Sequence, residues 1–305
     1  MGFSRLLMII TDAADGPHAI GVCPETIFTK RPIMEKIMLA LDAHQINMCT
    51  VDFACYIARL THSKLTGVFL EGVTPDDYGY MPGSGDASYE DGGKDLTEQQ
   101  VMKTIEQFRE SCVCRETSNL IHRDRGMPLS EVLEESRFAD LIILDPSTSF
   151  SRADRSIPSR FVKDVLEGSE CPVLIAPYSF NAVEEIVFAY DGTESSVFAI
   201  KQFAHLFPGL ADKKTTVVSV RDGEGMTLEQ QFKIKEWLKA HYPHVEFVVL
   251  RGTASDELFG YLIDKKNAIV VMGAYGRKMF SRFFKPSQAR LVMKSVNLPV
   301  FIAHQ

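Results

Sequence analysis

No apolar run in this sequence of 305 residues approaches the roughly 18 residues that a transmembrane helix needs. An excess of positive charge is missing too, because 33 Lys and Arg residues stand against 40 Asp and Glu residues, for a net charge of -7. Electrostatic binding to nucleic acid or to a membrane surface is therefore not expected. With 45% apolar residues, the composition is that of a globular protein with enough material for large cores.

Cysteine is scarce and unpatterned. All six cysteines lie in the first 180 residues, and Cys112 and Cys114 have no partner pair at the spacing of zinc ligands. There is no C-x-x-C motif. A chain of this length does not need disulfides, so we interpret the cysteines as reduced thiols in a cytoplasmic protein, packed as small hydrophobic side chains.

The common motifs of enzymatic chemistry are also missing. There is no G-x-x-x-x-G-K-[S/T] phosphate loop, no G-x-S-x-G nucleophile elbow and no H-E-x-x-H metal motif. The eight histidines are scattered, and the one close pair, His241 and His244, flanks Pro243 as in a loop that ends a helix. We therefore predict no catalytic residues, no metal ligands and a role that is not enzymatic.

The first 33 residues lack the regular pattern found in the remainder of the sequence. Their apolar run, residues 6–10, is too short for a signal sequence, and Asp12 and Asp15 come directly after it. Met34 then precedes a clean strand pattern, as at the start of many α/β domains. We interpret residues 1–33 as an N-terminal extension outside the core, either an appended arm or the product of an upstream start codon.

Residues 34–305 contain an internal repeat. Four pairs of segments resemble each other and occur in the same order in both halves. The pairs are 37–42 with 186–191, 125–131 with 251–257, 139–144 with 267–272, and 171–176 with 298–303. Four anchors in one order indicate a duplication.

Each unit alternates short apolar runs with helical patterns. Continuous apolar runs indicate parallel strands that helices cover on both faces. We therefore predict an α/β protein of two tandem, doubly wound, five-stranded parallel-sheet domains, residues 34–178 and 183–305. The first unit also carries an acidic segment rich in Gly and Tyr, residues 71–95, which is either a solvated insertion or a loop that docks a partner.

A ligand of such a sheet binds at the carboxyl ends of the strands, where the strand order reverses. In the second unit these ends carry Asp191 and the pair Gly273 and Gly276. Asp191 can accept a hydrogen bond from a ribose hydroxyl or a base edge, and glycines let the backbone approach a phosphate. Residues 181–305 also have a net charge of +3, which suits an anion. Plain turn chemistry is the alternative explanation for the glycines.

These residues resemble the universal stress proteins, which carry G-x-x-G, nine residues and then G-[S/T] after the fourth strand, with an Asp after the first. The same spacing occurs in both units, as Gly273-x-x-Gly276 to Pro286-Ser287 and as Asp145-x-x-Thr148 to Pro158-Ser159. The resemblance spans residues 34–305 and implies a tandem universal stress protein with a Rossmann-like fold, related to the adenine nucleotide α-hydrolases. One branch of that family binds adenine nucleotides at this crevice.

For the second domain, the resemblance implies a site for ATP or AMP, with Mg²⁺ only alongside the nucleotide. The implied binding residues are Ala189, Asp191, Val220, Met272, Gly273, Gly276, Arg277, Ser287 and Gln288. Pro286 removes one N–H donor from this site and Ala289 removes a hydroxyl, so we expect weak binding. In the first domain Asp145 puts a carboxylate where a phosphate should rest, so we expect no nucleotide there.

We therefore predict a universal stress protein that serves as a non-enzymatic stress-response sensor or scaffold and can hold ATP or AMP in its second domain. Two alternatives stay open: a slow ATPase or other nucleotide-handling enzyme, and a pure protein-interaction module with both sites degenerate. We also predict an intramolecular pseudo-dimer through the last strands, 173–176 and 300–303, because an uncovered edge strand is a liability. The protein partner and any further homo-oligomer stay open.

Overall fold

The structure, a computed structural model, describes residues 33–72, 92–151, 154–221, 228–273 and 296–303. Residues 1–32 of the predicted extension and most of the acidic segment 71–95 lie outside these ranges. The boundaries predicted for the two domains stay predictions.

Strands and helices alternate in the first half. Its strands are β1 (Ile37–Asp42), β2 (Leu65–Leu70), β3 (Asn119–Asp124), β4 (Leu141–Leu144) and β5 (Val173–Ile175). Its helices are α1 (Met48–Leu60), α2 (Gly92–Cys114), α3 (Pro128–Ser136) and α4 (Arg160–Gly168). The runs of β1, β2, β4 and β5 are buried almost throughout, as strands covered on both faces must be.

The second half repeats this alternation. Its strands are β6 (Glu185–Ala189), β7 (Lys214–Arg221), β8 (Val245–Arg251), β9 (Ala268–Gly273) and β10 (Val300–Ala303). Its described helices are α5 (Glu194–Leu206), α6 (Leu228–Lys239) and α7 (Ala254–Ile263), with a 3-10 turn at Pro208–Leu210. None of the helices in the described ranges is long and apolar enough to cross a membrane.

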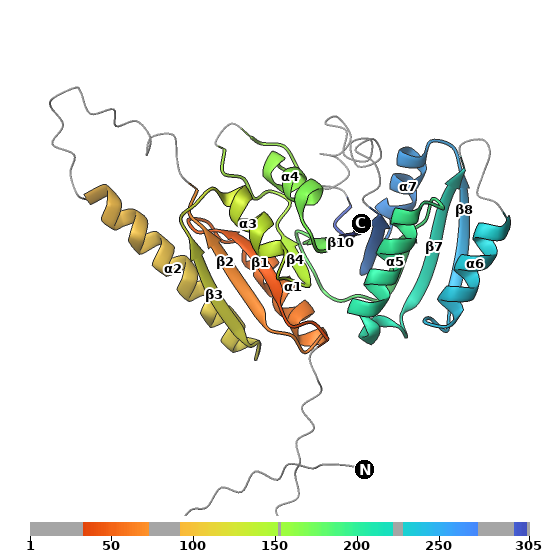
Figure 1. The fold of residues 1–305 in the computed structure, drawn as a ribbon, viewed down its shortest axis with the longest axis horizontal. Helices are drawn as coiled ribbons and strands as arrows, with labels where there is room; N and C mark the ends of the chain where they lie inside the picture. The colour runs from red at the N-terminus through yellow and green to blue at the C-terminus, as the bar shows by residue number, and fades with distance from the viewer. Residues whose placement is uncertain (1–32, 73–91, 152–153, 222–227, 274–295, 304–305) are drawn as a thin grey trace, which may run out of the picture. The chain divides into compact units, whose positions relative to one another are not determined.

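Within the described residues, the strands form one sheet of ten in the order β3-β2-β1-β4-β5-β10-β9-β6-β7-β8 (Figure 1). The first five strands are parallel to one another, and so are the last five. From its outer edge inward, each half has its third, second, first, fourth and fifth strand. The two halves therefore share one topology, the doubly wound order that the apolar runs predict.

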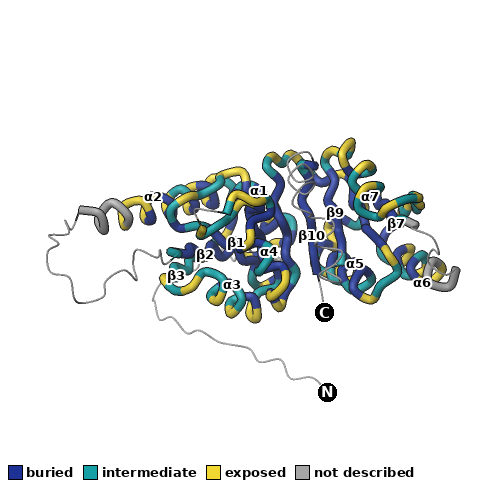
Figure 2. The backbone as a smooth tube through the Cα atoms, turned by 90° about the horizontal axis from the view of Figure 1, so that it is seen from above, coloured by how far each residue is buried: buried dark blue, intermediate teal, exposed yellow. Residues whose placement is uncertain are grey.

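Helices cover both faces of the sheet. One buried cluster contains Leu39 and Leu41 of β1 together with residues of α1, α2, α5 and α6. The other contains Met38 and Ala40 of β1 together with residues of α3, α4 and α7. Figure 2 shows the buried strands in dark blue and the exposed residues on the outer sides of the helices. The predicted fold class is confirmed.

The last strand of each half joins the two parallel parts. β5 and β10 pair antiparallel, with Leu174 opposite Phe301. Both strands are buried along their whole length, and the Phe301 ring packs against Phe203 and Phe207. The pairing of these two strands agrees with the contact that the sequence predicts, and it removes two edges that would otherwise expose unpaired backbone groups.

Candidate functional site

The carboxyl ends of β6 and β9 are the place where the strand order of the second half reverses. From β6 the chain passes to β7 and β8 on one side, and then to β9 and β10 on the other. Ala189 of β6 pairs with Met272 of β9. Asp191 and Gly273, which come just after these residues, therefore lie at the same edge of the sheet, where ligands of open parallel sheets bind. The fold thus brings four of the predicted binding residues together.

Asp191 is exposed and begins the turn into α5. Its Oδ1 accepts hydrogen bonds from the backbone N–H of Thr193 at 2.9 Å and from the Thr193 hydroxyl at 2.6 Å. Thr193 is also the N-cap of α5, and its hydroxyl oxygen accepts the N–H of Ser196 at 3.3 Å. None of the described residues forms a hydrogen bond with Asp191 Oδ2, so this oxygen can accept one from a ligand.

Gly273 lies where the end of β9 touches the first turn of α5. A Cβ atom at this position would stand 2.5 Å from the carbonyl carbon of Ser195 and 2.6 Å from its carbonyl oxygen. No side chain fits at such distances, because backbone atoms on a packed helix cannot move aside freely. Close packing therefore requires this glycine, whether or not a ligand binds beside it.

Ser195 is a residue of this edge that sequence reasoning missed. It is 4% exposed, and its Oγ has no hydrogen-bond partner among the described residues. It also belongs to the first turn of α5, where backbone N–H groups lack helical partners and the helix carries partial positive charge. Its sequence signal is weak, because serine is common at the start of any helix.

The strand register makes Asp145 the equivalent of Gly273 in the first half. Leu144 precedes Asp145 and pairs with Ala40 of β1. Met272 precedes Gly273 and pairs with β6 in the same way. The two residues therefore occupy the same place at the carboxyl edge of each half.

Asp145 fills the edge of the first half with its own carboxylate. The residue is 6% exposed, and its Oδ2 accepts hydrogen bonds from the Thr50 hydroxyl at 3.0 Å and from the side chain of Asn47, the N-cap of α1. Its Oδ1 accepts the N–H and the hydroxyl of Ser147 at 2.7 Å and 2.5 Å. An anionic ligand placed here would be repelled by the buried carboxylate. Asp145 also already accepts the hydrogen bonds that Asn47 and Thr50 donate at the start of α1.

The remaining predicted residues are less well placed. Val220 is half-buried in β7, two residues beyond Val218, whose carbonyl accepts the N–H of Tyr190 at 2.9 Å. Four further predicted binding residues lie outside the described ranges: Gly276, Arg277, Ser287 and Gln288. Pro286 and Ala289, which we expect to weaken binding, also lie outside them. The described part of the chain contains no group of three or more His, Cys, Asp or Glu side chains that could hold a metal ion.

A groove of about 520 Å³ lies beside this edge, between α5 and α6. Its lining joins aromatic rings and lysines, including Tyr190, Phe198, Lys201, Lys233 and Trp237. Burial raises the pKa of Tyr190, and the negative charge of Asp191 adds to this effect. Because Gly192 and Thr193 also line the groove, a ligand at the end of β6 has room to extend along the helices.

Comparison with known proteins rests on structure alone. No family model matches the sequence, and no curated protein matches it. A universal stress protein from Archaeoglobus fulgidus DSM 4304 is similar in structure, with a TM-score of 0.64 and 14% identity over 88% of this chain and 98% of that one.

Two structures from Pseudomonas aeruginosa are also similar. A protein of unknown function from strain PAO1 has a TM-score of 0.52 and 15% identity over 89% of this chain and 92% of its own. A protein assigned provisionally to the universal stress proteins, from strain UCBPP-PA14, has a TM-score of 0.53 and 15% identity over 89% and 93%. Over nearly nine-tenths of its length, the chain has the fold of a universal stress protein.

Proposed function

We propose that the chain is a universal stress protein of the tandem form, with domains at residues 34–178 and 183–305, and that its second half binds an adenine nucleotide where β6 and β9 end. One observation carries this proposal, which is the difference between Asp145 and Gly273 at equivalent positions. The first edge is filled by the buried carboxylate of Asp145, which accepts four hydrogen bonds. The second edge has no side chain at that position.

The groups left at the second edge suit a nucleotide. Asp191 Oδ2 can accept a hydrogen bond from a ribose hydroxyl, and the Ser195 hydroxyl is a buried donor without a partner among the described residues. The first turn of α5 adds N–H groups and partial positive charge toward an anion. Mg²⁺ would accompany the phosphates, because that ion usually binds through a few carboxylates and substrate phosphates.

The proposed role is that of a non-enzymatic sensor or scaffold in a stress response. The described edge offers hydrogen-bond donors and an acceptor, which are sufficient for binding. We propose that the nucleotide-bound and nucleotide-free forms differ in how they present this edge to a protein partner. The pseudo-dimer formed through β5 and β10 would hold one binding edge and one filled edge in a single chain.

Calorimetric titration of the full chain with ATP and with AMP, at fixed Mg²⁺, tests the binding proposal. We expect one site per chain and about tenfold weaker binding for Asp191→Asn, because a hydrogen bond to a charged acceptor contributes about 1.5 kcal/mol. Asp42→Asn is the matched control: Asp42 accepts the N–H of His44 at 2.8 Å, much as Asp191 accepts that of Thr193. Two equivalent sites, or equal weakening by both variants, would contradict the proposal.

Phosphate release from ATP separates the binding role from the alternatives. We expect no release above that of buffer. Release that Asp191→Asn reduces would favour a slow ATPase at the same edge. If neither ATP nor AMP binds the intact chain, the interaction module with two degenerate edges becomes the better explanation.

A further inference from the structure

Two cysteines from neighbouring helices face each other in the first half. Cys55 on α1 and Cys112 on α2 are both 0% exposed, and their Sγ atoms lie 3.8 Å apart in a thiol hydrogen bond. The two helices cover the same face of the sheet, and both cysteines belong to the same buried cluster. Other small hydrophobic side chains could fill this space equally well, but only two thiols can form a covalent bond across it.

A polar cluster holds α1 and α2 together at the level of the two thiols. Arg115, just beyond the end of α2, pairs with Asp52 of α1 at 2.6 Å and donates a hydrogen bond to the Ser111 hydroxyl at 3.0 Å. Asp52 lies one helical turn before Cys55, and Ser111 adjoins Cys112. The ion pair therefore keeps the two sulfur atoms in register.

The surroundings make the two thiols chemically unequal. The hydrogen bond from Cys112 lowers the pKa of Cys55, and a hydrogen bond from Thr117 and the charge of Arg115 lower it further, against the opposing effects of burial and Asp52. The hydrogen bond to Cys55 and burial raise the pKa of Cys112. Cys55 is thus the better nucleophile of the pair, because the thiolate is the reactive form. By contrast, burial raises the pKa of Cys171 to about 12.

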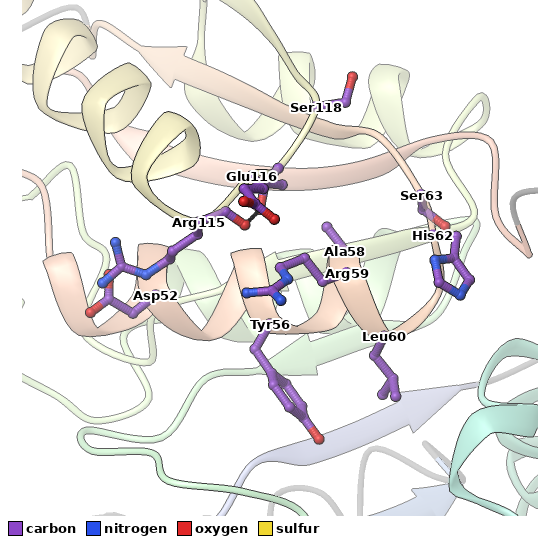
Figure 3. Close-up of a pocket in the computed structure, with 11 residues that line it drawn as sticks. Asp52, Tyr56, Ala58, Arg59, Leu60, His62, Ser63, Arg115, Glu116 and Ser118 are labelled. Atoms are coloured by element: carbon purple, nitrogen blue, oxygen red, sulfur yellow. Dashed lines mark hydrogen bonds and ion pairs between the residues drawn. The ribbon is translucent and has the colours of Figure 1, made fainter. Parts of the chain in front are cut away.

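A cavity of about 760 Å³ reaches toward this pair from the ends of α1 and α2. Figure 3 shows Arg115 extending to Asp52 at one side of the cavity, with Arg59 at the same opening. Thr117, which contributes to the lowered pKa of Cys55, also lines the cavity. Asp52 and Tyr56, which also line the cavity, lie on α1 within three residues of Cys55.

We propose that Cys55 and Cys112 form a dithiol site that a small hydroperoxide, such as hydrogen peroxide, oxidises to a disulfide. This site lies in the half that the nucleotide proposal leaves empty, and it does not depend on nucleotide binding. To form the S–S bond, the two sulfur atoms must approach from 3.8 Å to about 2.05 Å. The disulfide would tie α1 to α2 across the segment between them.

The oxidation takes place in two balanced steps. The Cys55 thiolate attacks one oxygen of hydrogen peroxide, the O–O bond breaks, and Cys55 becomes a sulfenic acid while the other oxygen leaves as water with the thiol proton. Cys112 then attacks the Cys55 sulfur, the S–S bond forms, the S–O bond breaks, and hydroxide leaves as water with the Cys112 proton. The two thiols give up two electrons in total, and one peroxide accepts them.

The test uses the full chain with its other four cysteines changed to serine, so that only Cys55 and Cys112 can react. After treatment with hydrogen peroxide and alkylation of the remaining thiols, mass spectrometry should find a monomer that has lost two hydrogens and takes up no alkylating reagent. Dithiothreitol should restore both thiols. If this variant does not fold, peptide mapping of the oxidised wild-type chain looks for the same Cys55–Cys112 crosslink.

Arg115→Gln should slow the oxidation by about threefold or more, because it removes a positive charge that favours the Cys55 thiolate. Arg59→Gln is the matched control, since Arg59 lines the same cavity but does not contribute to the pKa of Cys55. The proposal is overturned if both thiols stay reduced in the folded chain, if Cys55 ends as a sulfinic acid without a crosslink, or if the two arginine variants react equally fast.

Discussion

Position 273 requires a glycine because the backbone of Ser195 lies directly against it. Its missing Cβ leaves room for the Ser195 backbone, so the first turn of α5 can approach the end of β9. Gly260, inside α7, is the opposite case, because a Cβ there would meet nothing within 4 Å. The same residue type is thus required at one position and dispensable at the other.

Alanine at these two positions should change stability in opposite directions. Gly273→Ala is expected to lower the free energy of unfolding by about 1–3 kcal/mol, because the new methyl group overpacks against backbone atoms. Gly260→Ala is expected to raise it by about 0.5–1 kcal/mol, since alanine loses less conformational entropy in a helix. Denaturant titrations of both variants measure this. Equal effects would show that β9 and α5 do not touch as closely as described.

Residues at the candidate site differ in how well sequence could locate them. Asp191 and Gly273 were located because each comes at the end of an apolar strand, and strand ends are readable along the chain. Ser195 was missed, because its importance comes from the end of β9, far away in sequence. The sequence indicates that Gly273 lets the backbone approach a phosphate, whereas the structure also gives this glycine a packing reason that no spacing could indicate.

At the scale of elements, Glu185 ties β6 to β7 and to the end of α7. Its Oε1 accepts hydrogen bonds from the Thr216 hydroxyl at 2.8 Å and from Lys265 Nζ at 2.9 Å. Lys214 lies 3.4 Å away. Burial alone would raise the pKa of Glu185, but the hydrogen bonds from Lys265 and Thr216 and the two lysine charges together lower it.

This lowered pKa predicts a pH dependence of stability. A carboxylate whose pKa is lower in the folded than in the unfolded chain stabilises the fold fully above the unfolded pKa of about 4.3, and loses that effect as the pH falls through the folded pKa. Glu185→Gln should therefore lower the free energy of unfolding at pH 7 by about 1–3 kcal/mol and bring its stability closer to wild type in acid.

Denaturant titrations across the acid range measure the difference in the free energy of unfolding between wild type and variant. Glu236→Gln, a change at an exposed carboxylate on α6, is the control, and its free energy of unfolding should differ from that of wild type by close to zero at every pH. A Glu185→Gln effect that stays constant from neutral pH into the acid range would contradict the linkage argument.

At the scale of the whole molecule, β5 and β10 decide whether the chain is one sheet or two. Their antiparallel pairing turns the innermost edge of each half into a central strand. Both buried clusters also contain residues of both halves. Each half by itself would expose both the hydrogen-bonding edge and part of these apolar clusters.

The fragment 34–178 expressed alone is therefore expected to self-associate or aggregate, because β5 would be an uncovered apolar edge. Light scattering after gel filtration measures this. Co-expression with the fragment 183–305 should instead give a complex with one copy of each, since β10 covers the edge that β5 would otherwise expose. A fragment 34–178 that stays monomeric and folded would show that the strand pairing is not needed.

The class of fold, the order of elements and the equivalence of Asp145 and Gly273 can be recognised in the amino-acid sequence, because they depend on local patterns and on spacing along the chain. An apolar run that must be buried on both faces can be recognised without knowing its neighbours. Two contacts arise from tertiary packing alone: the Thr50 hydroxyl donates a hydrogen bond to Asp145, 95 positions away, and the thiols of Cys55 and Cys112 lie together across 57 positions. Such contacts depend on how helices pack onto a shared sheet, and packing joins residues that no local pattern relates.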